Sequence, residues 1–185
     1  AEAIVCDNTD PASLVEARGL FPHHLDTIVN VPAPCWETGD PRTYSLTDLA
    51  AAWRNTLDAK VLSAVLTVQT VGDHLRSGGS IISVVPENPR AGSADAAVKA
   101  ALSDWTAGQA TVFGTRGITV NVVASGSGTS PGYDGLTWGR PLAGDTPPTV
   151  AAEVARLALF LTTPAARHIT GQTLHVSHGA LAQFG

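Results

Sequence analysis

Short β-branched runs alternate along the chain with longer stretches in which apolar residues recur every three or four positions. Five runs have the length and composition of strands: residues 3–6, 27–31, 80–85, 118–124 and 172–176. Four longer amphipathic stretches predict helices: residues 11–18, 46–75, 94–113 and 150–161. Strands that alternate with helices in this way predict an α/β domain, with a mostly parallel sheet and helices on both faces.

The stretch at residues 46–75 gives the clearest helix signal. Ser45 precedes it, and Asp48 follows three residues later, which resembles a capping box with aspartate in place of glutamate. Ser93 stands in the same position before residues 94–113. Both long helices are therefore expected to begin at a serine cap.

The composition is typical of one folded domain over residues 1–185, because 44% of the residues are hydrophobic and only 15% are charged. The net charge of -5 and the absence of a lysine or arginine run exclude a nucleic-acid partner. The sequence contains no run of about 18 apolar residues, so no membrane span is expected. The first residues show no signal peptide, which predicts a cytoplasmic protein.

Cysteine and histidine give no sign of a metal or redox site. Cys6 and Cys35 lack the spacing of either, and reduced thiols are favoured over a disulfide. His23 and His24 are adjacent and have no third ligand at a fixed spacing, so no metal is expected.

Four segments resemble, in the right order, segments of the short-chain dehydrogenase/reductase family. Residues 169–176, Ile-Thr-Gly-Gln-Thr-Leu-His-Val, look like its closing motif, and residues 117–124 look like its sixth strand. Residues 25–30 are similar to the stretch that leads into its Asn-Asn-Ala-Gly motif, and residues 6–10 to the acidic motif after its third strand. The resemblance implies a Rossmann-like, doubly wound sheet.

The glycine-rich turn that holds the cofactor pyrophosphate in this family, Thr-Gly-x-x-x-Gly-x-Gly, does not occur in the chain. Because the match begins at the family's third strand, we expect the first two βα units to be absent. About five strands then remain, provided that residues 3–6 move inward to pair with residues 27–31. We expect no cofactor, or NAD(P) if any. The resemblance places the remnants of a cofactor site at four residues: Asp7, Asn30, Gly126 and Thr129.

The family's catalytic tyrosine and lysine stand four residues apart on the helix that matches residues 94–113. Lys99 matches the lysine, but Asp95 occupies the tyrosine position. An aspartate is ionised at neutral pH and has no proton to give to a substrate. Asp95 lies in the first turn of the expected helix, where the helix dipole stabilises a negative charge. It is also expected to pair with Lys99.

Two further catalytic positions also depart from the family pattern. The catalytic serine position falls on Val85 or Pro86, and Ser83 lies about two residues too early. Lys60 stands where the family has an asparagine on the preceding helix. Since such groups act as a unit, hydride transfer is in doubt, and Lys99, Asp95 and Ser83 are expected to be a vestigial catalytic set.

Three functions are compatible with this pattern. The first is a non-catalytic member of the family that forms a homo-oligomer, or a hetero-oligomer with a related reductase, through helices 46–75 and 94–113. The second is an NAD(P)-dependent oxidoreductase whose nucleotide-binding segment is missing from this chain. The third is another activity in the inherited cleft, with Asp95 and Lys99 near Ser83 as an acid/base group.

Overall fold

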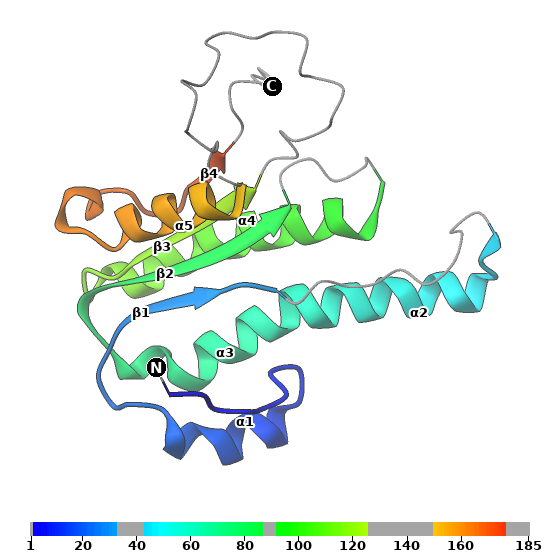
Figure 1. Cartoon of the computed structure of the whole chain (residues 1–185), viewed down its shortest axis with the longest axis horizontal. Helices are drawn as coiled ribbons and strands as arrows, with labels where there is room; N and C mark the ends of the chain where they lie inside the picture. Colours follow the sequence, from blue (N-terminus) through cyan, green and yellow to red (C-terminus); the bar gives the residue numbers. More distant parts are fainter. Residues whose placement is uncertain (1, 33–42, 87–91, 126–149, 177–185) are drawn as a thin grey trace, which may run out of the picture.

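The computed structural model describes residues 2–32, 43–86, 92–125 and 150–176 (Figure 1). In this part of the chain four strands form one parallel sheet, in the order β1-β2-β3-β4. The strands are β1 (Leu25–Asn30), β2 (Leu75–Pro86), β3 (Thr119–Ser125) and β4 (Thr173–Val176). The predicted α/β fold class, with its parallel sheet and helices on both faces, is confirmed.

The two faces of the sheet are covered by different helices. Ile81 of β2 points to one face, where it lies in a buried cluster with Val68 of α3 (Ser63–Val71). The helix α4 (Ala94–Gly114) packs on the same face, through Val98 and Leu102. The next residue, Ile82, points to the opposite face and meets Leu161 of α5 (Val150–Leu161).

The expected strand at residues 3–6 is wrong, so the described sheet has four strands where about five were expected. This segment leads instead into α1 (Pro11–Ala17), which is followed by a 3-10 turn at Arg18–Leu20. Arg18 anchors this region to the end of α3, because its guanidinium donates to Asp73 at 2.5 Å and to the carbonyl of Thr70. With α1 held beneath α3, the first segment does not reach the ladder of β1.

The helix expected over residues 46–75 is interrupted. It consists of α2 (Leu46–Leu57), a π-helical turn (Asp58–Leu62) and α3, and a 3-10 turn (Gly72–His74) then leads into β2. The predicted capping box at its start is confirmed, since Ser45 and Asp48 exchange side-chain and backbone hydrogen bonds. The predicted cap at Ser93 is confirmed as well, because its hydroxyl accepts from the backbone N–H of Ala96.

The last strand is tied to β3 by a buried asparagine. The Asn121 side chain donates to the carbonyl of Ile169 at 2.8 Å and accepts from the N–H of Gln172 at 3.2 Å. Both bonds fix the turn that precedes β4, where Gly171 adopts a φ of 70°. No helix in the described part of the chain is long and apolar enough to cross a membrane.

Candidate functional site

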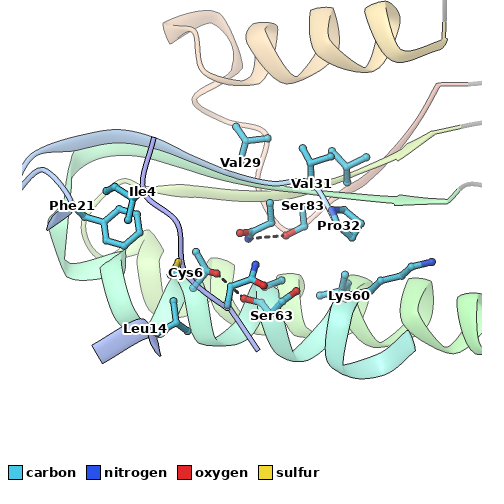
Figure 2. Close-up of a pocket in the computed structure, with 16 residues that line it drawn as sticks. Ile4, Cys6, Leu14, Phe21, Val29, Val31, Pro32, Lys60, Ser63 and Ser83 are labelled. Carbon is cyan, nitrogen blue, oxygen red and sulfur yellow. Dashed lines mark hydrogen bonds between the residues drawn. The ribbon is translucent and has the colours of Figure 1, made fainter. Parts of the chain in front are cut away.

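A cavity of about 370 Å³ lies between the edge strand β1, the helix α3 and the first segment of the chain (Figure 2). Ile4 and Cys6 line its outer side, and Cys6 is a free thiol of intermediate exposure. The polar side chains around it come from β1, β2, the interrupted helix and the first segment: Asn30, Ser83, Lys60, Ser63, Thr67 and Asn8. Two of the predicted site residues, Asn30 and Ser83, therefore meet at one cavity.

Asn30 and Ser83 are brought together by the sheet. They are register partners on the parallel strands β1 and β2. The amide of Asn30 donates to the hydroxyl of Ser83 across 3.4 Å, close to the outer limit for a hydrogen bond. Ser83 is 1% exposed, and it belongs to the sheet face that α3 and α4 cover. Its hydroxyl is thus held by a neighbouring strand at the wall of the cavity.

Lys60 and Asp95 form an ion pair across the two helices. The Lys60 ammonium donates to the Asp95 carboxylate at 2.6 Å, and the two side chains are 12% and 39% exposed. The π-helical turn carries Lys60, and the first turn of α4 carries Asp95. A π-turn inside an α-helix is a feature often found at functional sites. Two positions at which the sequence departs from the expected catalytic set are therefore in contact.

The sequence alone did not predict this contact, because it suggested Lys99 as a partner for Asp95, a pairing that stays a prediction. Lys99 lies one helical turn further along α4, is partly buried and does not line the cavity. One signal in the sequence could have indicated the ion pair. Two uncharged family residues, the tyrosine and the asparagine, are replaced here by residues of opposite charge, Asp95 and Lys60.

Asp7 lies near the cavity but does not line it. Its carboxylate accepts from the backbone N–H of Thr9 at 2.9 Å and from the Thr9 hydroxyl at 2.7 Å, and these bonds lower the pKa of the Asp7 carboxyl. The residue therefore closes the turn before α1, and its expected role near an adenine stays a prediction. Gly126 and Thr129 lie outside the described residues.

Comparison with known proteins identifies the family. A family model described as enoyl-(acyl carrier protein) reductase matches residues 1–180. A solved short-chain dehydrogenase/reductase from Serratia marcescens superimposes with a TM-score of 0.68 and 28% identity, over 96% of this chain and 77% of that chain. The chain belongs to the short-chain dehydrogenase/reductase family.

Two other relatives extend the comparison. A Mycobacterium tuberculosis protein named as an oxidoreductase is 73% identical over 184 residues, which cover all of this chain and 79% of that protein. A short-chain dehydrogenase from Burkholderia cenocepacia, solved in complex with NADP, has a TM-score of 0.70 and 29% identity, over 95% of this chain and 74% of that chain.

The residues that line this cavity do not provide a pyrophosphate site for a dinucleotide such as the NADP bound in the Burkholderia cenocepacia structure. A pyrophosphate needs a glycine turn at a helix N-terminus, or free cationic side chains. Among the residues that line the cavity, Lys60 is the one cation, and Asp95 neutralises it. The described part of the chain also brings together no group of three or more His, Cys, Asp or Glu side chains that could hold a metal.

Proposed function

We propose that this chain is a non-catalytic member of the short-chain dehydrogenase/reductase family and acts as a partner subunit of a related reductase. The ion pair between Lys60 and Asp95 is the observation that carries the proposal. A carboxylate bound to an ammonium group only accepts hydrogen bonds, so Asp95 has no proton to exchange with a substrate oxygen.

Ser83, a second residue of the vestigial set, and its neighbour Ser63 are engaged as well. The hydroxyl of Ser83 accepts from Asn30, a contact that belongs to the sheet rather than to a substrate. The Ser63 hydroxyl, on the same wall of the cavity, donates to the carbonyl of Ala59 at 2.7 Å. Polar groups that bind one another in this way stabilise the local structure, and this supports a scaffold in preference to a proton relay.

The surface proposed for the partner is the outer side of helices 46–75 and 94–113. The helix α2 has no buried residue and extends past the end of the sheet (Figure 1). Leu46 and Leu49 on α2 and Val112 on α4 are exposed. Apolar side chains on an amphipathic helix are normally covered, and a second subunit of this family would remove them from water.

The test measures assembly and activity separately. Sedimentation velocity of the chain alone, and mixed with catalytically complete family reductases, should show a dimer or a mixed complex. Leu49→Glu should abolish it, whereas Val15→Glu, at an exposed apolar residue on α1, should not. A chain that stays monomeric with every reductase tested contradicts the partner role. Reductase activity of the unchanged chain contradicts the non-catalytic role.

A second candidate, an NAD(P)-dependent oxidoreductase completed by a segment outside this chain, is favoured by the open side of the sheet. Among the described residues no strand pairs with the outer edge of β1. Beside that edge, Val29, Val31 and Leu159 line an apolar groove of about 680 Å³ between β1 and α5. A strand and helix that added to β1 would cover both.

Cofactor binding distinguishes the two candidates. The oxidoreductase candidate requires that NADPH or NADH at about a hundred times its dissociation constant stabilises the protein by roughly 2.7 kcal/mol, which raises the melting temperature by several degrees. The partner-subunit proposal expects no shift with either cofactor, and a saturable shift in this chain would overturn its non-catalytic part.

A further inference from the structure

A second cavity, of about 380 Å³, lies on the other face of the sheet, near the start of β2 and β3. Its walls include the side chains of Ser80 and Thr119 and, from the segment that follows α5, Arg167. It shares no lining residue with the cavity at Lys60. Any ligand bound here would be separated from the candidate site by the thickness of the sheet.

Two buried residues that line this cavity, Ser80 and Thr119, carry hydroxyl groups. Ser80 is 4% exposed, and its hydroxyl lies 3.0 Å from the hydroxyl of Thr27, with either group able to donate. Thr119 is 6% exposed, and its hydroxyl forms no hydrogen bond with any described residue. The Thr119 hydroxyl is therefore able to donate to an oxygen of a ligand in the cavity.

Arg167 gives the cavity its charge. Its Nε donates to the carbonyl of Pro164 at 3.2 Å, which holds the guanidinium in place. The two terminal nitrogens form no bond to a described residue, and none of the residues that line the cavity is acidic. A guanidinium fork with free N–H groups matches two oxygens of a carboxylate or phosphate.

Two glycines shape the rim. Gly78 and Gly117 have φ angles of 80° and 67°, which other residues rarely adopt. Their backbone N–H groups donate to the carbonyls of Arg116 and Gly114 and are therefore occupied. A ligand in this cavity would be bound by side chains instead.

We propose that this cavity binds the oxyanion group, phosphate or carboxylate, of a small molecule. Arg167 binds two of the oxygens, and the hydroxyl of Thr119 donates to an oxygen at the buried end. The site is independent of the proposed partner role, because it uses neither the helices of the partner surface nor the groups around Lys60.

The experiment titrates the full chain with inorganic phosphate and, separately, with succinate, at constant ionic strength. Binding is followed by calorimetry and by the amide signals of Gly79, Ser80 and Thr119. Two variants remove one recognition element each: Arg167→Gln takes away the fork, and Thr119→Val keeps the shape of the side chain without its hydroxyl. Arg156→Gln, at an exposed arginine outside the cavity, is the matched control for charge.

The proposal expects saturable binding of at least one probe, at least a tenfold weaker dissociation constant in Arg167→Gln and in Thr119→Val, and an unchanged constant in Arg156→Gln. Phosphate alone would identify a phosphorylated ligand, and succinate alone a carboxylate. No saturable binding, or binding that all three variants retain, overturns the proposal. Because Arg167 is exposed, its variant is expected to fold even if Thr119→Val does not.

Discussion

Replacing Asp95 by asparagine should destabilise the chain more than replacing Lys60 by methionine. The two side chains are 2.6 Å apart but unequally exposed, at 39% for Asp95 and 12% for Lys60. Asp95→Asn leaves an ammonium group that is largely shielded from water without its counter-charge, and this should cost about 2–3 kcal/mol. Lys60→Met leaves a carboxylate that water can reach, and the methionine still fills the space of the lysine stem, so its cost should be about 1 kcal/mol.

The double variant completes a thermodynamic cycle. It removes both charges and should be less destabilised than the sum of the single variants, with a coupling energy of about 1–2 kcal/mol. Urea unfolding followed by circular dichroism gives the free energy of unfolding of the four proteins. Additive single costs, or a Lys60→Met cost larger than that of Asp95→Asn, would refute the assignment of the ion pair and of its buried partner.

Three further predictions concern the scaffold. Asn121→Ala should cost about 3 kcal/mol, because it leaves the Ile169 carbonyl and the Gln172 N–H unpaired, and hydrogen exchange at Gln172 should accelerate; unchanged exchange there would contradict this role. Gly79→Ala should cost about 2 kcal/mol, since a Cβ atom would lie 2.8 Å from the carbonyl oxygen of Asp26, whereas Gly19→Ala meets nothing within 4 Å and should unfold in urea as the unchanged chain does. The Arg18 guanidinium lowers the pKa of Asp73, so the ionised carboxylate contributes stability above about pH 4 and loses it as the pH falls through the lowered pKa. Asp73→Asn should therefore cost about 0.5 kcal/mol at neutral pH and nothing measurable near pH 2, and an equal cost at both pH values would count against the ion pair.

Local signals in the sequence were sufficient to predict where most elements begin. Ser45 with Asp48, and Ser93 before α4, predicted helix caps that the structure confirms, because a cap depends on residues three positions apart. The π-helical turn at Asp58–Leu62 could not be predicted in this way. The residues of this turn are compatible with an ordinary α-helix. The wider turn depends on tertiary contacts of the helix, which the local sequence does not show.

The candidate site was also predictable only where its contacts follow from local sequence and strand order. Asn30 and Ser83 could be expected near one another, since both lie toward the ends of parallel strands. The contact between Asp95 and Lys60 could not be predicted, because the sequence has two lysines and the nearer one along the chain is Lys99. The contact with Lys60 joins residues 35 positions apart, and only the packing of α4 against the interrupted helix brings them together.

The order of the strands has a consequence for how the chain folds as it is made. Each of the strands β2, β3 and β4 hydrogen-bonds to the strand that precedes it in the sequence, so its first partner has already been synthesised. Contacts between neighbouring segments form faster than contacts between distant ones, and N-terminal parts begin to fold during synthesis. Once β1 and β2 have left the ribosome and paired, the free edge of β2 is available to β3. The free edge of β3 is then available to β4. The sheet can therefore grow in one direction, from β1 to β4, at the pace of translation.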